Sequence, residues 1–353
     1  MYIKDIPTPA LILDKTAFEE NLKAMEDLLK GSSLGLRPHY KSHKCAQIAK
    51  KQMEQCAVGM TCAKLSEAED LVDSGIENIL IANQIVQPEK LLRLAVLAGK
   101  CRLTVCVDYK DNIDGLAKAA QAAGTTIHCL VEFEIGMERC GVTEPGQVLE
   151  LAQYIMNQKG LSFEGIQAYA GHISHMESQA QRESLTAANC KKVAGLVSYL
   201  NENGVPVNTV SGGSTGTAQI KARQNLYTEL QAGSYIFMDA AYDKLATPFK
   251  NALFLLTTVV SAKEGLAVVD SGVKTCGVDQ GMPRFVGVET GQIVASEEHF
   301  QLHQPSRALK IGELLRMIPA HCCSTVNLHD RIYLVENDKV IDRLWITGRG
   351  YGE

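Results

Sequence analysis

The stretch RLTVCVDYKDNIDGLAKAAQAAGTTIHCLVEFE, residues 102–134, holds the pattern that decides the fold class. It opens with an apolar, β-branched run, Arg102–Asp108, and closes with a second one, Ile127–Glu134. Between them, the apolar residues of Asn112–Ala123 recur at spacings of three and four, which is the period of an amphipathic helix. A strand, a helix and a strand in this order predict one β–α–β unit of a parallel sheet.

The same unit repeats along most of the first 248 residues. Further apolar runs that predict strands are Pro9–Asp14, Gly35–Tyr40, Ala57–Ala63, Asn78–Asn83, Phe163–Ala170 and Val207–Ser211. Helical spacing recurs in Lys15–Lys30, Ser66–Ser74, Lys90–Gly99, Val148–Gln158 and, longest of all, Ser178–Asn203. About eight strand–helix repeats predict an α/β fold, a TIM-type (β/α)₈ barrel rather than an open sheet.

The pattern changes after about Phe249. The later β-like segments are separated by Gly, Pro and charged turns: Leu253–Ala262, Gly265–Asp270, Gly291–Ser296, Leu314–Met317, Arg331–Glu336 and Lys339–Ile346. We therefore expect a barrel at residues 9–248. A C-terminal all-β domain should follow at residues 249–353, with residues 1–8 adding a strand to it.

Composition excludes several classes of protein. The chain has 353 residues, a formal net charge of −5 and no long basic run, which argues against nucleic acid or an anionic membrane as partner. The apolar stretches have the length of strands, and Met1–Ala10 lacks the pattern of a signal peptide. The 11 cysteines are scattered without CxxC spacing, so we expect reduced thiols and a cytoplasmic protein.

Four polar clusters follow predicted barrel strands, where functional residues of such barrels gather. The clusters are Arg37–Lys44, Glu132–Gly141, Gln167–His175 and Ser211–Thr217. In the first, RPHYKSHK, a lysine at the barrel mouth is a candidate for a Schiff base, although a solvated basic loop has the same composition. In the last, SGGSTGT, backbone N–H groups and threonine hydroxyls can form an anion nest.

The segment HCCSTVNLHD, residues 321–330, is a candidate metal motif in the β domain. His321 and Cys323 are two residues apart, so in an extended backbone they project from the same face and can chelate one ion. Cys322 would then point the other way. Imidazole and thiolate suit zinc better than magnesium. An isolated His-x-Cys pair is also compatible with a packed histidine and a buried cysteine.

Taken as whole strings, these segments resemble the D-threonine aldolase and D-serine dehydratase family. Its members share the alanine-racemase type of pyridoxal-phosphate (PLP) barrel. The matching strings run from Thr8–Ala10 through RPHYKSHK to Asn327–Asp330, so the resemblance covers nearly the whole chain.

The resemblance implies a role for each candidate residue. Lys41 would carry the Schiff base, and Arg139 would face the phenolic oxygen of the cofactor. The remaining cofactor-binding residues, on the ring or on the phosphate, would be Gln167, Tyr169, Thr215, Gly216, Thr217, Gly233, Ser234 and Tyr235. His321 and Cys323 would hold the divalent metal, zinc first, with manganese, cobalt or magnesium as alternatives. His329 and Asp330 would support them, and His175 would act in catalysis near the substrate.

The expected function is that of a PLP- and metal-dependent lyase acting on D-3-hydroxy amino acids. His-x-Cys resembles the D-serine dehydratase branch, whereas the D-threonine aldolase branch carries His-x-Asp, so D-serine dehydration is the first expectation. The alternatives are D-threonine aldolase-type cleavage and a dehydratase or aldolase for 3-hydroxyaspartate. A racemase and a non-catalytic PLP-binding protein rank lower. The partner would be a small-molecule amino acid. By analogy with the fold, we expect a homodimer.

Overall fold

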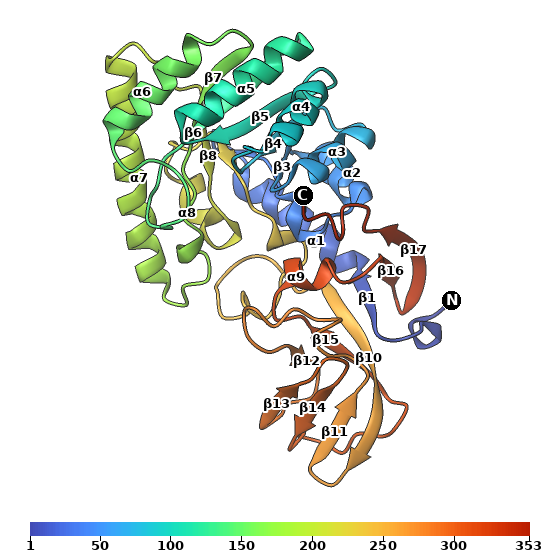
Figure 1. Cartoon of the computed structure of the whole chain (residues 1–353). Helices are drawn as coiled ribbons and strands as arrows, with labels where there is room; N and C mark the ends of the chain where they lie inside the picture. Colours follow the sequence, from blue (N-terminus) through green and yellow to red (C-terminus); the bar gives the residue numbers. More distant parts are fainter. The chain divides into compact units, whose positions relative to one another are not determined.

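The computed structural model describes all residues, 1–353, and its chain divides into two compact units. The barrel unit comprises Glu26–Lys41, Ala49–Gly233 and Tyr351–Glu353. The sheet unit comprises Met1–Met25, Ser42–Ile48 and Ser234–Gly350. In Figure 1 the barrel unit runs mainly from light blue to yellow, and most of the sheet unit is orange and red.

The barrel unit is built on eight parallel strands in the order β2-β9-β8-β7-β6-β5-β4-β3. They are β2 Gly35–Leu36, β3 Met60–Cys62, β4 Asn78–Ile81, β5 Arg102–Val107, β6 Ile127–Glu132, β7 Leu161–Gln167, β8 Thr209–Gly212 and β9 Glu229–Leu230. The two ends of the sheet also meet, because Val58 N donates to Leu36 O at 2.8 Å and Thr61 N donates to Pro38 O at 2.8 Å. The predicted α/β barrel is confirmed.

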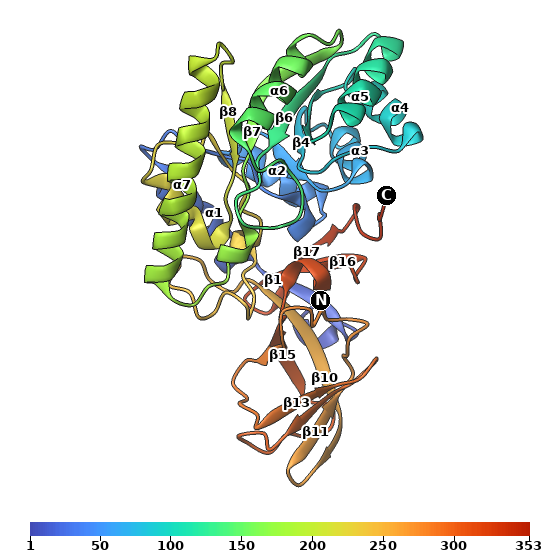
Figure 2. The same cartoon turned by 60° about the vertical axis from the view of Figure 1, so that its left-hand side comes forward.

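Amphipathic helices flank these strands (Figures 1 and 2). They are α2 Ala46–Gln55, which begins in the sheet unit, α3 Leu65–Asp73, α4 Pro88–Leu97, α5 Lys110–Ala123, α6 Pro145–Met156, α7 Gln179–Glu202 and the short α8 Ala218–Ala222. Helix α5 illustrates the sequence logic: it buries Ile113, Leu116 and Ala120 at helical spacing and ends at Gly124, whose φ of 67° is left-handed. None of the helices is both long and apolar enough to cross a membrane.

The sheet unit is a nine-stranded sheet with the main order β13-β14-β11-β10-β1-β16-β17, while β15 pairs with β10 and β12. Its strands are β1 Ala10–Asp14, β10 Leu253–Lys263, β11 Leu266–Val269, β12 Arg284–Phe285, β13 Gln292–Ala295, β14 Phe300–His303, β15 Leu314–Ile318, β16 Arg331–Glu336 and β17 Lys339–Trp345. The unit also contains α9 Cys322–Val326 and most of α1 Lys15–Leu29, so the expectation of an all-β domain was too strict.

The first predicted barrel strand is wrong. β1 pairs antiparallel with β10 and parallel with β16 in the sheet unit, and β9 is the eighth barrel strand. The run ALILD is buried along most of its length, which suits the centre of either sheet, so only distant residues decide its partners. Residues 1–8 add only an isolated antiparallel bridge, from Tyr2 to Lys339, instead of the expected strand, because Ile3–Asp5 forms a 3₁₀ turn.

Candidate active site

A cavity of about 180 Å³ opens among the segments that follow the barrel strands. Four predicted cofactor-binding residues line it: Lys41, Arg139, Gln167 and Tyr169. The other lining residues are His39, Ala63, Ala82, Asn83, Gln84, Glu132, Cys140 and Gln231. The parallel barrel brings these residues together because the carboxyl ends of its strands share one rim.

Lys41 lies in a 3₁₀ turn, Tyr40–Ser42, shortly after β2. The backbone before it is well anchored: Tyr40 is fully buried and donates its hydroxyl to Asp70 on α3. Lys41 N donates to His39 Nδ1 at 3.4 Å. The Lys41 side chain is half-buried and lines the cavity, so its position suits an amine that must meet a bound aldehyde.

Two neighbours of Lys41 have local roles. His43 is fully buried, and its Nδ1 accepts a hydrogen bond from Cys45 N at 3.2 Å, so it bonds within the loop. The side chain of Lys44 is buried, and its Nζ donates to Gly348 O at 3.3 Å. Of the two lysines in RPHYKSHK, only Lys41 lines the cavity.

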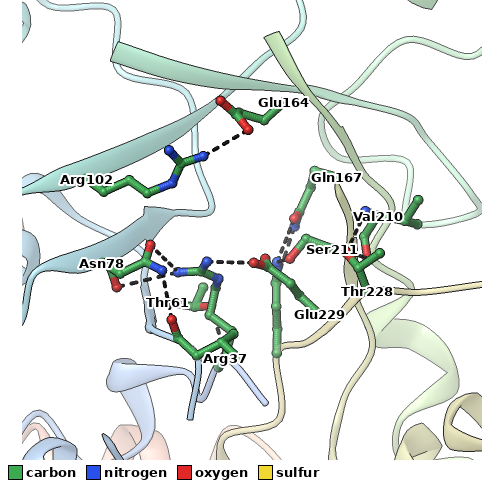
Figure 3. Close-up of polar contacts among 12 residues, drawn as sticks. Arg37, Thr61, Asn78, Arg102, Glu164, Gln167, Val210, Ser211, Thr228 and Glu229 are labelled. Carbon is green, nitrogen blue, oxygen red and sulfur yellow. Dashed lines mark hydrogen bonds and ion pairs between the residues drawn. The ribbon is translucent and has the colours of Figure 1, made fainter. Parts of the chain in front are cut away.

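Buried amides form one side of the cavity and define a polar network inside the barrel (Figure 3). Gln231 Nε2 donates to Gln167 Oε1 at 2.6 Å and to Ser211 Oγ at 2.9 Å. In the same interior, Arg37 forms a 2.6 Å ion pair with Glu229 and donates to Asn78 Oδ1 at 3.2 Å. The amides are therefore pre-oriented, which suits a site that must hold a polar ring in register. Sequence analysis did not assign a role to Gln231.

Glu132 is a buried carboxyl on another wall of the cavity, and sequence analysis did not single it out. Gln84 Nε2 donates to Glu132 Oε2 at 2.6 Å and to Asp108 Oδ2 at 3.2 Å. Burial raises the pKa of Glu132, although the bond from Gln84 and the charge of Arg139 oppose this effect. Gly141 N also donates to Asp108 Oδ2, at 2.9 Å. This network stiffens the wall next to Arg139.

Arg139 is exposed at the cavity and forms no ion pair. Neither nearby carboxylate pairs with it: Glu132 accepts from Gln84 Nε2, and Glu134 accepts backbone N–H groups of Met137 and Glu138, each at 2.6 Å. The Arg139 guanidinium lies instead 5.7 Å from the centre of the Tyr169 ring. An uncompensated cation beside an aromatic face suits an anionic oxygen of a bound ligand.

The glycine-rich turn after β8 contains a buried hydroxyl without a partner. Gly213 has a φ of 80°, and a Cβ there would lie 2.7 Å from Lys221 Cδ, so the turn requires glycine. The Thr217 hydroxyl is used within the turn, where it accepts from Ser214 N at 3.1 Å. Thr215 Oγ1 is buried and has no hydrogen-bond partner. A free hydroxyl in such a turn fits an anion such as phosphate.

The remaining predicted residues do not line the cavity. Gly216 lies in the 3₁₀ turn Thr215–Thr217, and Gly233 follows β9. Ser234 and Tyr235 are buried in the sheet unit, where the Tyr235 ring packs 5.6 Å from that of Phe249. His175 is half-buried and follows the turn Gly171–Ile173. The roles of these residues stay predictions.

Comparison with known proteins decides the family. Residues 13–241 match the family model "Alanine racemase, N-terminal domain", and residues 252–335 match "Putative serine dehydratase domain". The chain is 38% identical to D-threonine aldolase of Arthrobacter sp, over 98% of this chain and 93% of the relative. The chain belongs to the D-threonine aldolase and D-serine dehydratase family.

Two further members of the D-threonine aldolase and D-serine dehydratase family are about as similar over the full length. A 3-hydroxy-D-aspartate aldolase of Paracoccus denitrificans (strain Pd 1222) is 39% identical, over 99% of this chain and 93% of the relative. The crystal structure of D-threonine aldolase from Filomicrobium marinum superposes with a TM-score of 0.95 at 38% identity, covering 99% of this chain and 98% of that one. The predicted family membership is confirmed, and the chain is a lyase.

The family is one of PLP enzymes, and the barrel unit contains groups that fit this cofactor. Lys41 presents an amine to the cavity, and Arg139 presents an unpaired cation beside the Tyr169 ring. Thr215 Oγ1 is a buried hydroxyl that lacks a partner in the protein alone. The aldehyde of PLP would complement Lys41, its phenolate oxygen would complement Arg139, and its phosphate would complement Thr215.

The metal motif was expected to be extended, but its backbone is partly helical. His321 precedes α9 and Cys323 lies inside it, so the two residues are not in an extended segment. Their side chains nevertheless interact electrostatically. Cys322 is fully buried, and its sulfur lies 4.0 Å from that of Cys323 rather than on the opposite side. Ser42, the residue after Lys41, has its Oγ 3.4 Å from Cys323 Sγ.

No group of three or more His, Cys, Asp or Glu side chains is arranged as a complete metal site. One imidazole and one thiol still fit an ion that keeps open positions for a substrate. His329 and Asp330, which the resemblance implied would support the two ligands, bond to other groups. His329 Nε2 donates to Thr275 O at 2.7 Å, and Asp330 forms a 2.5 Å ion pair with Arg349. Asp279, which sequence analysis missed, bonds His321 Nδ1 at 2.6 Å.

Proposed function

We propose that this lyase cleaves the Cα–Cβ bond of a D-3-hydroxy amino acid and releases glycine and an aldehyde. The observation that supports this choice is that the aldolases among the relatives are more similar in sequence to this chain than the dehydratases are. The aldolases of Arthrobacter sp and Paracoccus denitrificans are 38% and 39% identical to the chain. The D-threo-3-hydroxyaspartate dehydratase of Delftia sp. is 28% identical, and the D-serine dehydratase of Dictyostelium discoideum is 23% identical.

Residues of the barrel unit would bind PLP. Lys41 would bond its aldehyde carbon, Arg139 would face its phenolic oxygen, and Thr215 with the surrounding turn would receive its phosphate. When bound, PLP supplies an electron sink next to Cα of the substrate. Gln231 and Gln167 would hold the ring edge, since their amides are fixed by a 2.6 Å hydrogen bond.

Residues of the sheet unit would bind the divalent ion. His321 and Cys323 would hold it and leave open positions, and the ion would supply Lewis-acid polarisation of the β-hydroxyl of the substrate. Ser42 Oγ is 3.4 Å from Cys323 Sγ, and Ser42 is joined to Lys41 by a peptide bond.

Cleavage requires two proton movements that side chains must serve. The β-hydroxyl loses its proton as the Cα–Cβ bond breaks, and His175 is our candidate acceptor. Cα gains a proton as glycine forms, and Lys41 Nζ is our candidate donor because it lines the cavity. The D configuration is proposed from the named relatives.

Dehydration of D-serine to pyruvate and ammonia is the second candidate, favoured by Cys323. By the resemblance stated in the sequence analysis, His-x-Cys is the motif of the dehydratase branch. For this reaction Lys41 Nζ would accept the α-proton, and hydroxide would leave from Cβ. A 3-hydroxyaspartate substrate is compatible with either reaction.

Product analysis distinguishes these candidates. The holoenzyme is offered D-threonine, D-threo-3-hydroxyaspartate and D-serine separately, with and without a chelator. Glycine and an aldehyde, lost on chelation, would support the proposal. Keto acid and ammonia would favour the dehydratase. Racemised substrate without either product would contradict a lyase assignment to these substrates.

A further inference from the structure

The loop between β11 and β12 touches the metal motif at three alternate residues. Thr275 O accepts from His329 Nε2 at 2.7 Å, and Gly277 N donates to Thr325 Oγ1 at 3.0 Å. Two residues further on, Asp279 bonds His321. All of these residues belong to the sheet unit. Neither the fold nor the proposed reaction explains why this loop follows the motif so closely.

The carboxylate of Asp279 is held at both oxygens. Oδ2 lies 2.6 Å from His321 Nδ1, and Oδ1 accepts a hydrogen bond from Ser324 Oγ at 2.5 Å. The Asp279 side chain is 49% exposed, so solvent screens its charge and an ion pair alone would contribute little to stability. The contact therefore contributes to geometry more than to stability, because it fixes the rotation of the imidazole ring of His321.

The backbone sets the distance between the loop and α9. A Cβ on Gly277 would lie 1.9 Å from Ser324 Oγ, so no larger residue fits there without displacing the loop. Ser324, the residue after Cys323, is the same serine that orients Asp279. Close packing at Gly277 thus holds Asp279 within reach of His321.

We infer that Asp279 is a positioning residue for the metal ion proposed at His321 and Cys323. When Nδ1 donates its proton to a carboxylate, Nε2 keeps the lone pair that a metal ion requires. The carboxylate also makes the imidazole a better ligand. This inference rests on the proposed function, because that function supplies the metal.

A matched control lies nearby. Asp330 belongs to the same unit and is exposed, but it pairs with Arg349 and not with His321. If charge near the motif were sufficient, Asp279→Ala and Asp330→Ala would weaken metal binding alike. If the bond to Nδ1 is decisive, only Asp279→Ala will do so.

The test measures the dissociation constant of Zn²⁺ on the PLP-loaded protein by competition with a chromogenic chelator. Cys323→Ser identifies the ion bound at the motif, since the chain has 11 cysteines that could take up zinc elsewhere. We expect Asp279→Ala to raise the dissociation constant about 10- to 100-fold. Asp279→Asn, whose amide oxygen can still accept from Nδ1, should recover part of the loss. Ser324→Ala should have a smaller effect, and Asp330→Ala should have none.

Two further readouts separate positioning from a general structural role. The PLP absorbance and the melting temperature of the metal-free protein should be the same for Asp279→Ala and wild type. Equal zinc affinity of Asp279→Ala and wild type would overturn the inference while leaving the proposed function intact. Wild-type protein that binds no metal at the motif would overturn both.

Discussion

The cavity of the barrel unit and the metal motif of the sheet unit position their side chains in different ways. In the barrel, Lys41, Arg139 and Gln167 are far apart in sequence, yet the parallel strands β2, β6 and β7 bring them to one cavity. In the sheet unit, His321 and Cys323 are two residues apart, but the loop carrying Asp279 orients the histidine. Topology thus places the first set of residues, whereas side-chain hydrogen bonds orient the second.

This difference predicts how each site responds to substitution. Loss of a cavity residue should remove chemistry and leave its neighbours in place, because strands hold them. Loss of a residue beside the metal motif should change ligand geometry, because individual bonds hold it.

Replacing Lys41, the proposed cofactor lysine, should abolish turnover. Lys41→Ala removes the amine in the cavity, so reduction with borohydride should no longer attach PLP to the protein. Absorbance spectra and mass spectrometry after reduction measure this. The exposed Lys51 supplies the control, and Lys51→Ala should behave as wild type. Turnover by Lys41→Ala at the wild-type rate would contradict the role of Lys41.

Removing the proposed thiol ligand should separate metal binding from cofactor binding. Cys323→Ala should keep the PLP absorbance, lose the bound metal and lose at least ~100-fold in activity, more than loss of a supporting residue costs. Metal analysis and product assays measure this. Cys56→Ala, at a half-buried cysteine in the barrel unit, is the matched control. Full activity of Cys323→Ala without added metal would refute the metal-dependent mechanism.

Breaking the buried ion pair should test whether the barrel interior depends on charge. Arg37 and Glu229 have side chains 7% and 13% exposed, so Arg37→Met leaves a buried carboxylate without its cation. We expect the free energy of unfolding to fall by about 3–5 kcal/mol, as measured in urea. The double variant Arg37→Met, Glu229→Gln should recover part of this loss. If the double variant is no more stable than the single one, the pair is not coupled.

Lys221 should make stability depend on pH. It is buried against the Tyr227 ring, and burial lowers the pKa of its amine from 10.5 to about 8. The unfolded chain therefore binds more protons between these values, so wild-type stability should rise with pH there and stay level below about 8.

Lys221→Met should remove that rise and add about 1–3 kcal/mol at pH 7, because the shift corresponds to ~1.4 kcal/mol per pKa unit and the aromatic contact offsets part of it. Urea unfolding from pH 7 to 10 measures both effects. Parallel pH profiles for the two proteins would show that the buried amine is not the cause.

The barrel was predictable because its signal is local and repeated. Each of seven barrel strands, β2 to β8, overlaps a predicted apolar run, and the polar clusters after β2, β6 and β7 supply the cavity. The error at β1 has a physical cause: ALILD is buried in the nine-stranded sheet much as a barrel strand would be. Local pattern indicates a buried strand, but distant residues select its neighbours.

The metal motif was less predictable in detail. The pair His321 and Cys323 could be recognised, but five residues of α9 carry too little helical pattern to predict a turn of helix. Asp279 could not be predicted from motif spacing, because it lies in a separate loop that contacts His321 only in the folded chain. Gln231, just after β9, and Glu132, at the end of β6, were given no role because a single amide and a single carboxyl form no sequence motif.

The position of β1 also bears on how the chain folds. β1 precedes the barrel segment, yet Leu11 pairs with Ile332 in β16 and with Leu255 in β10, both of which follow it. Contacts between such distant residues close long loops, which slows folding. During synthesis from the N-terminus, residues 49–233 can therefore assemble while β1 still lacks its partners. Until β10 and β16 emerge, β1 is an unpaired apolar strand that is exposed to aggregation or chaperone capture.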